Sequence, residues 1–363
     1  MTRRSRHLAR TLVSVVLMTL ASAGCSSAPL PDSSLSTSAT TVAPTTTTTT
    51  IAPTTTVSPL TIYEPYAGTA PALPPAGQSS VGQLRTADGR TRTYRLYVPA
   101  SLDPSRPAPL LIALHGGLGT SSQFEANSGF TGLAEANRFV VVYPDGIGAR
   151  ADGTGPQTWN GGYCCGPAAR NDVDDVGFVR QLLDTLAAER PIDPARTYAT
   201  GHSNGGIMAY RLACELSDRI VAIGIQAGSL GVESCTPTQP VSVIHLHGTA
   251  DTNHPIGGGV GEGVSGVAFR PALDAVEALA ATDGCGPAPI PGLDPANPDL
   301  TVATWAPCEN DTAVRYVVVD GATHAWMGRP AQSEIASSFV GEPYPNLDAS
   351  RAIWSFLATH PRR

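Results

Sequence analysis

Residues 197–214 read TYATGHSNGGIMAYRLAC, and this stretch decides how the chain is interpreted. A short β-branched and aromatic run gives way at Gly201 to apolar residues at helical spacing, which predicts a strand, a tight turn and a helix. Ser203 lies between Gly201 and Gly205 in a G-x-S-x-G pattern. In that pattern a strained strand-to-helix turn exposes a serine hydroxyl. Ser203 is therefore a candidate nucleophile, and a glycine-rich turn without chemistry is the alternative.

Apolar runs and helical patterns alternate from residue 79 to the C-terminus. Runs rich in Val, Ile and Leu occupy 108–114, 139–144, 196–202, 220–228, 241–248 and 313–319. Apolar residues at helical spacing occupy 174–190, 204–216, 270–284 and 348–360. Strands that are continuously apolar are typical of parallel sheets buried on both faces. The sequence therefore predicts an α/β fold with a mostly parallel central sheet and helices on both faces.

Two further reactive residues follow predicted strands. Asp251 ends the run 241–251, and His324 follows the last strand. Reactive groups gather at the carboxyl ends of parallel strands, and the chain order serine, aspartate, histidine is that of α/β-hydrolases. In such a triad His324 takes the proton of Ser203 while Asp251 orients the imidazole. The alternatives are a turn or cap aspartate and a histidine buried in the core.

An acyl-transfer site also needs two donors for the developing oxyanion. The backbone N–H of Asn204, directly after the serine, is one candidate. The second is expected in the glycine loop after the strand 108–114, where Gly117 is the preferred residue and Leu118 the competing neighbour. The alternative is that these glycines only allow the loop to turn.

Several motifs together resemble the secreted polyhydroxybutyrate-depolymerase-like esterases, a group that includes feruloyl and acetylxylan esterases. They read LHGGLGTSSQFE, YPDG, TWNGGYCCGPAARNDVDDVGFV, TGHSNGGIMAYRLACEL, HLHGTAD and GATHAW. The resemblance runs from about residue 80 to the C-terminus. It implies an α/β-hydrolase fold and a serine esterase mechanism without a cofactor. The family's catalytic residues fall on Ser203, Asp251 and His324, and its oxyanion donors on Asn204 and Gly117. Depolymerases often carry cysteine at the position of Gly117, which favours a small-ester substrate over a polymer.

Two tryptophans are candidate walls of a substrate pocket. Trp159 lies in the sequence QTWNGGYCCG, and Trp326 follows His324 by two residues. Aromatic side chains bury flat substrates efficiently, and core packing is the alternative for both. The stretch from Gly261 matches G-x-G-x-x-G, but it does not join a strand to a helix in a nucleotide-binding unit, so no cofactor is expected.

The seven cysteines indicate an oxidising compartment. With Cys25 set aside, an even number remains, which predicts three disulfides. Cys285 and Cys308 are expected to pair across a proline-rich insertion. Cys164 and Cys165 either bond to each other or pair with Cys214 and Cys235. No paired C-x-x-C set or H-E-x-x-H motif occurs, so a structural metal is not expected.

The N-terminal part has the composition of a targeting segment. Residues 1–25 combine arginines, a short apolar run and small residues before Cys25, which predicts a signal peptide with Cys25 as a lipidation site; ordinary secretion is the alternative. Residues 26–78 form a Thr/Pro/Ser-rich tether, and 79–363 the catalytic domain. The net charge of -7 argues against nucleic-acid binding. Membrane contact is expected only through a lipid on Cys25.

These patterns predict an exported serine carboxylesterase. The substrates expected are short-chain or aromatic esters of the feruloyl or acetyl type, either as small molecules or linked to polysaccharide. Hydrolysis would proceed through an acyl-enzyme. A polyhydroxyalkanoate depolymerase is one alternative. A non-catalytic cell-surface binding protein is the other, and the combination of Ser203, Asp251 and His324 argues against it.

Overall fold

The computed structural model describes residues 77–150, 153–331 and 333–363. The predicted signal segment 1–25, with Cys25, and nearly all of the predicted tether 26–78 lie outside the described residues. Across the described ranges, no helix has the length and apolar character needed to cross a bilayer. The first strand begins at Ser79.

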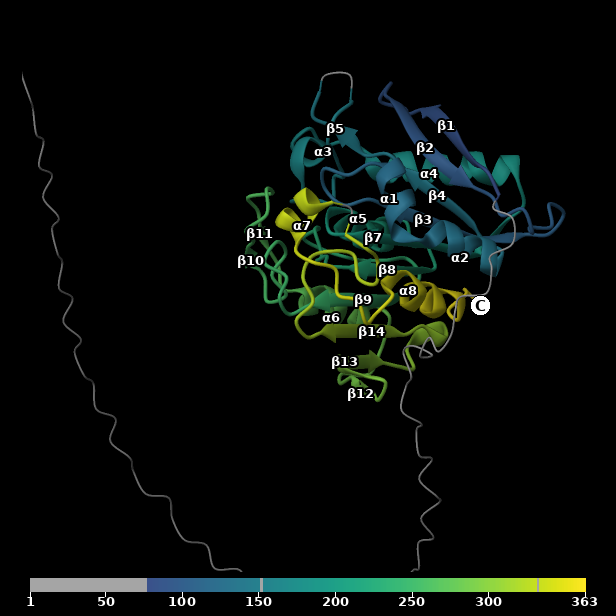
Figure 1. Cartoon of the computed structure of the whole chain (residues 1–363). Helices are drawn as coiled ribbons and strands as arrows, with labels where there is room; N and C mark the ends of the chain where they lie inside the picture. The colour runs from purple at the N-terminus through teal and green to yellow at the C-terminus, as the bar shows by residue number, and fades with distance from the viewer. Residues whose placement is uncertain (1–76, 151–152, 332) are drawn as a thin grey trace, which may run out of the picture. The chain divides into compact units, whose positions relative to one another are not determined.

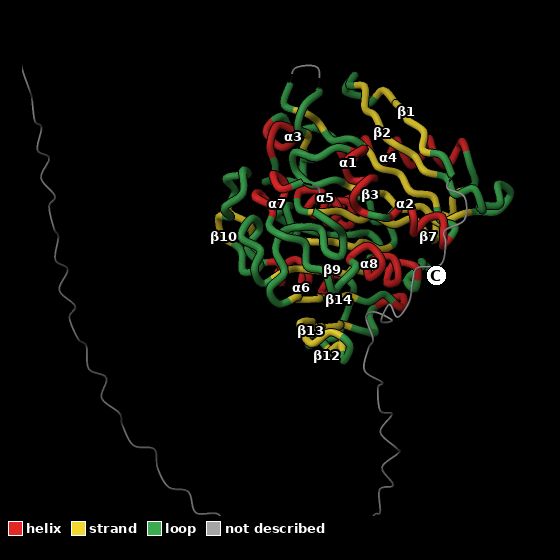
Figure 2. The backbone as a smooth tube through the Cα atoms, in the orientation of Figure 1, coloured by secondary structure: helices red, strands yellow, loops and turns green. Residues whose placement is uncertain are grey.

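A ten-stranded sheet forms the centre of the domain, in the order β1-β2-β4-β3-β7-β8-β9-β14-β13-β12 (Figures 1 and 2). The six strands from β4 to β14 in this order are mutually parallel, and the strands at both edges are antiparallel. The sheet strands are β1 (Ser79–Arg85), β2 (Thr91–Tyr97), β3 (Ala108–Leu114), β4 (Val140–Pro144), β7 (Ile192–His202), β8 (Ala222–Gln226), β9 (Ser242–Gly248), β12 (Ile290–Asp294), β13 (Asn297–Trp305) and β14 (Val314–Val319). Two small ribbons pair β5 (Ile147–Gly148) with β6 (Gln157–Thr158) and β10 (Gly259–Val260) with β11 (Ala268–Phe269).

Helices cover both faces of this sheet. They are α1 (Ser121–Ser128), α2 (Phe130–Asn137), α3 (Gly166–Arg170), α4 (Asp175–Glu189), α5 (Asn204–Glu215), α6 (Ala272–Thr282), α7 (Glu334–Val340) and α8 (Ala349–Ala358), with a 3-10 turn η1 (Glu309–Asp311). Alternate residues of β3 belong to two separate apolar clusters, because successive side chains of a strand point to opposite faces. One cluster includes α4, α5 and α6, and the other includes α1, α2 and α8. The predicted α/β-hydrolase fold class is confirmed.

The proline-rich insertion between Cys285 and Cys308 contains two strands. It folds as the hairpin β12–β13, which pairs with β14 and extends the sheet. Pro291 lies in β12, the last strand of the sheet. Proline is tolerated at such an edge because the missing N–H removes no bond from a central strand.

The described residues contain three disulfides. Cys285 bonds to Cys308, as expected from the sequence, and Cys214 bonds to Cys235. Cys164 bonds to its neighbour Cys165, so the first of the two alternative pairings for these four cysteines is the one observed. Cys164 and Cys165 pack with Ile207 of α5 and Phe269 of β11 in a small apolar cluster.

Asp283, at the C-terminus of α6, is expected to make stability depend on pH. Burial, assisted by the charge of Glu309, raises the pKa of Asp283 to about 7, although the backbone N–H of Val241 donates to its carboxylate. The folded protein therefore holds this proton where the unfolded chain, with a pKa near 3.8, has released it. Stability from this group falls as pH rises from about 4 to about 7 and is level above that.

Asp283→Asn keeps an acceptor for Val241 without the charge. The free energy of unfolding is measured with urea at pH 5 and at pH 8. Between these two pH values it is expected to fall by about 2–4 kcal/mol more in the wild type than in the variant. The matched control is Asp274→Asn, an exposed carboxylate on the same helix. If the free energy of unfolding fell equally in wild type and in Asp283→Asn, Asp283 would not be the group that makes stability depend on pH.

Candidate active site

Ser203 occupies a sharp turn between β7 and α5. β7 ends at His202, α5 begins at Asn204, and Ser203 itself has φ 54° and ψ -120°. This positive φ is unfavourable for a residue with a Cβ. Side chains at the flanking glycines would collide with backbone: a Cβ on Gly201 would meet the carbonyl of Gly205, and one on Gly205 would meet that of Leu114. The two glycines of the G-x-S-x-G pattern therefore have a steric cause.

Asp251 and His324 meet at the carboxyl edge of the sheet. His324 Nδ1 lies 2.7 Å from Asp251 Oδ2. The other oxygen, Oδ1, accepts the backbone N–H groups of Asn253 (3.0 Å) and His254 (2.8 Å). Burial alone would raise the pKa of Asp251, but the charge and hydrogen bond of His324, with smaller contributions from His247 and the His254 amide, lower it below its usual value. Asp251 is therefore an ionised, oriented acceptor.

His202 joins the serine turn to the loop of His324. Its Nε2–H donates to the backbone carbonyl of His324 at 2.7 Å, and the two imidazole rings lie 4.9 Å apart. Burial and the nearby charge of His324 lower the pKa of His202 to about 3. His202 thus stays neutral and holds the His324 backbone beside Ser203. Among the described residues, no hydrogen bond joins the Ser203 hydroxyl to the His324 ring; such bonds often tighten only when substrate binds.

The two predicted oxyanion donors lie side by side. A Cβ built on Gly117 would be 3.6 Å from the Cβ of Asn204. Asn204 is the first residue of α5, where an amide has no acceptor within its helix. The competing donor, the N–H of Leu118, is already engaged with the carbonyl of Gln157 at 2.7 Å. This arrangement favours Gly117 over Leu118.

Buried His115 fixes the conformation of the glycine loop. Its Nδ1–H donates to the carbonyl of Gly116 (2.8 Å), and its Nε2 accepts the backbone N–H of Gly146 (3.0 Å). Burial lowers the pKa of His115 to about 4, which keeps this pair of bonds intact at neutral pH. The loop that carries Gly117 is therefore held by a neutral imidazole.

Trp159 lies in the core beneath the glycine loop. It is fully buried, and its indole N–H donates to the carbonyl of His115 at 2.9 Å. The side chain of Asn204 accepts the Trp159 backbone N–H (2.7 Å) and donates to its carbonyl (3.0 Å). These contacts favour the core-packing alternative for Trp159, which braces both predicted donor segments rather than facing solvent.

Trp326 also packs in the core. Its ring makes edge contacts with Phe124 and Phe130 at centroid distances of 5.3 and 6.0 Å, and its indole N–H donates to Ser350 Oγ. Only 7% of its surface is exposed. His202 packs against its other side at 5.6 Å. For Trp326 too, packing is favoured over the pocket-wall interpretation.

Sequence reasoning missed the supporting residues. The roles of His115, of the Asn204 side chain and of His202 depend on partners 31, 45 and 122 positions away. Their one signal was position, because each lies within two residues of Ser203 or Gly117, which the sequence had already singled out for chemistry.

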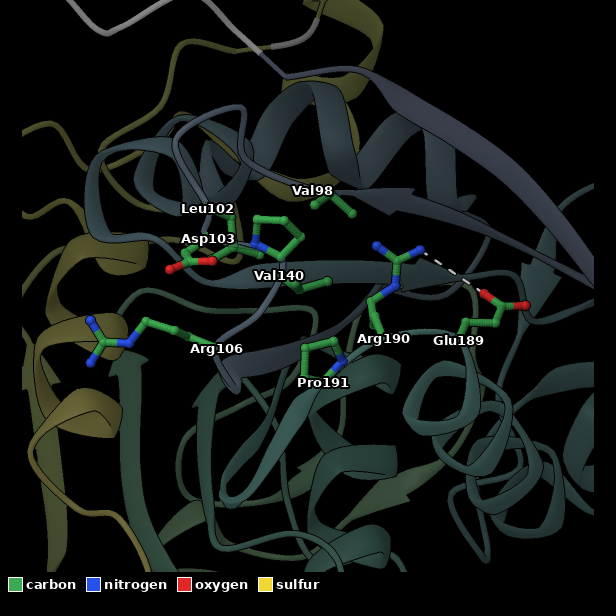
Figure 3. A pocket seen from close by; sticks show the side chains of 9 residues that line it. Val98, Leu102, Asp103, Arg106, Val140, Glu189, Arg190 and Pro191 are labelled. Carbon is green, nitrogen blue, oxygen red and sulfur yellow. Dashed lines mark ion pairs between the residues drawn. The ribbon is translucent and has the colours of Figure 1, made fainter.

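A surface cavity of about 240 Å³ lies elsewhere (Figure 3). Its walls include Val140, which begins β4, and Pro191, which directly precedes β7. It therefore lies at the amino ends of parallel strands, whereas Ser203, Asp251 and His324 follow carboxyl ends. This cavity is not the candidate active site. The described residues contain no cluster of His, Cys, Asp or Glu suited to a metal ion.

The mostly parallel sheet with helices on both faces is that of an α/β-hydrolase fold. A family model described as "Putative esterase" matches residues 86–276, more than half of the chain, so the chain belongs to this esterase family. The predicted family is confirmed.

The proteins that are similar to this chain include three that are named as esterases. "Feruloyl esterase B" of Piromyces equi is 30% identical over 62% of this chain and 41% of the relative. The bifunctional acetylxylan esterase/xylanase XynS20E of Neocallimastix patriciarum is 27% identical over 68% and 33%. "Putative esterase NocK" of Nocardia uniformis subsp. tsuyamanensis is 30% identical over 70% and 76%. The chain thus spans less than half the length of the first two.

Proposed function

We propose that this protein is an exported serine carboxylesterase that hydrolyses short-chain or aromatic esters through Ser203, His324 and Asp251. The observation that carries the proposal is the buried 2.7 Å contact between His324 Nδ1 and Asp251 Oδ2. His202, next to Ser203, hydrogen-bonds to the backbone of His324 and so links the His324 loop to the serine turn. An esterase family of which the chain is a member supports the reaction class.

The proposed reaction has two acyl-transfer steps. His324 accepts the Ser203 proton as the oxygen attacks the ester carbonyl, and the N–H groups of Gly117 and Asn204 stabilise the oxyanion. The alcohol leaves with the proton from His324, which gives the acyl-enzyme. Water, deprotonated by His324, then releases the acid and restores Ser203. Asp251 stabilises the imidazolium in both steps.

The substrate class rests on the relatives. Feruloyl and acetylxylan esterases are named among them, so we propose aromatic or acetyl esters, free or linked to polysaccharide, as substrates. Export is supported by the three disulfides. Lipid attachment at Cys25 is proposed from the sequence alone.

An ester panel tests this function. The purified protein is expected to hydrolyse nitrophenyl esters from acetyl to octanoyl, and methyl ferulate, with the best rates at short or aromatic acyl groups. Clearing of a polyhydroxyalkanoate suspension without turnover of the small esters would instead indicate a depolymerase. Lack of both activities together with no fluorophosphonate labelling would indicate a binding protein.

A further inference from the structure

Behind Asp251, three fully buried polar side chains form a continuous row. The hydroxyl of Tyr210, on α5, lies 2.7 Å from His245 Nδ1. His245 Nε2 lies 3.0 Å from His247 Nδ1, both on β9. His247 Nε2 in turn lies 2.8 Å from the backbone carbonyl of His254. We refer to Tyr210, His245 and His247 as the buried relay.

The direction of every hydrogen bond in the buried relay follows from its last acceptor. A carbonyl only accepts, so the Nε2 of His247 carries the hydrogen and its Nδ1 is an acceptor. His245 must then donate through Nε2 and accept at Nδ1, which leaves Tyr210 as the donor. Burial lowers the pKa of His245 and of His247, so both imidazoles stay neutral with one defined tautomer each.

The end of the buried relay reaches the acid of the proposed triad. His247 Nε2 is 3.6 Å from Asp251 Oδ2, the oxygen that faces His324. His254, whose carbonyl receives the His247 bond, also gives its N–H to Asp251 Oδ1. The opposite tautomer would turn the lone pair of His247 toward both a carboxylate and a carbonyl oxygen. The tautomer therefore decides whether this contact attracts or repels Asp251.

The other end of the buried relay lies on the helix that follows Ser203. Tyr210 lies on α5, two turns after Ser203. The relay thus connects the helix that begins at the serine turn to the loop that carries Asp251, through bonds that each have a single direction.

We propose that the buried relay positions Asp251: the His254 carbonyl fixes the tautomer of His247 and through it that of His245, Tyr210 supports the same tautomers as a donor from the other end, and His247 holds the 251–254 loop in register with His324. The proposal rests on the proposed function, since it assigns a role relative to the triad. His247 is a positioning residue, because it acts on the ester only through Asp251.

Tyr210→Phe, with Tyr316→Phe as matched control, tests the relay. Both tyrosine rings contact His245, with centroid distances of 5.8 and 5.4 Å. Of these two tyrosine hydroxyls, that of Tyr210 is the one hydrogen-bonded to His245. Tyr210→Phe is expected to lower kcat about 10-fold, the loss that corresponds to one hydrogen bond of ordinary net strength, with KM unchanged. The labelling rate of Ser203 by a fluorophosphonate should fall equally, and Tyr316→Phe should behave as wild type.

Imidazole tautomers give a readout that a merely structural role would not move. Two-dimensional ¹H–¹⁵N spectra of wild type are expected to show His245 and His247 protonated at Nε2, and Tyr210→Phe to shift the ¹⁵N resonance of His245 Nδ1, because that nitrogen loses its donor. His247→Gln places an amide donor near the original Nε2 and should retain most activity, whereas His247→Leu should lose at least as much as Tyr210→Phe.

The outcomes separate the two proposals. Wild type that is neither labelled nor active refutes the proposed function, while the tautomers can still be observed in that protein. Wild type that is labelled, with Tyr210→Phe labelled equally fast or the tautomers reversed, overturns the positioning role alone.

Discussion

Ser203→Ala is expected to lower kcat/KM for a short nitrophenyl ester by about 10⁴- to 10⁶-fold, because the acyl-enzyme can no longer form. The fold should persist, since alanine keeps the Cβ at the strained φ of 54° and the Ser203 backbone N–H still bonds to Gln226. The measurement is steady-state hydrolysis, together with mass spectrometry after fluorophosphonate treatment. The adduct should be found on Ser203 in wild type and be absent from the variant.

A buried serine beyond the other end of α5 provides the control. Ser217 is 1% exposed and its hydroxyl bonds to the backbone N–H of Thr238. Ser217→Ala should reduce thermal stability without lowering the rate per folded molecule. Turnover by Ser203→Ala at the wild-type rate would contradict the assigned nucleophile.

The centre of the fold was predictable because burial on two faces leaves a strong signal. The runs at 108–114, 220–228 and 241–248 are rich in Val, Ile, Leu and Ala, and they became β3, β8 and β9. The edge hairpin β12–β13 was not predictable from the same rule. Its half-exposed strands contain Pro291 and Pro298, which indicate a loop when a central strand is assumed.

Of the candidate site, the sequence predicted only those reactive residues that directly follow the carboxyl ends of parallel strands. Ser203, Asp251 and His324 each follow a parallel strand, and the structure brings Asp251 and His324 into contact. The tryptophans show the limit of the approach: Trp159 is adjacent to the site but wholly buried. Its position in the sequence predicted that Trp159 lies near the candidate site. The orientation of its side chain depends on how α5 packs against the glycine loop, and no local sequence pattern encodes that packing.

Asp251→Asn is expected to lower kcat about 10⁴-fold, a loss typical when the acid of such a triad becomes an amide. The reason lies in the acceptor count at this position. Asp251 Oδ1 accepts two backbone N–H groups and Oδ2 accepts His324 Nδ1–H. An asparagine has one oxygen, and the two backbone donors require it. Its NH₂ group then faces His324 Nδ1 and forces the ring proton onto Nε2, where it blocks acceptance of the Ser203 proton.

Asp320→Asn is the matched control, since Asp320 begins the turn that leads to His324 yet is exposed, and its carboxylate accepts a hydrogen bond from Thr249 rather than from His324. It should retain wild-type kcat. Near-UV circular dichroism and unfolding should show both variants folded, because either amide preserves the shape of the carboxylate. If Asp320→Asn were the inactive variant and Asp251→Asn the active one, the acid would have been assigned to the wrong strand end. Equal activity of both would mean that His324 needs no acidic partner, and the buried relay behind Asp251 would then have no catalytic group to position.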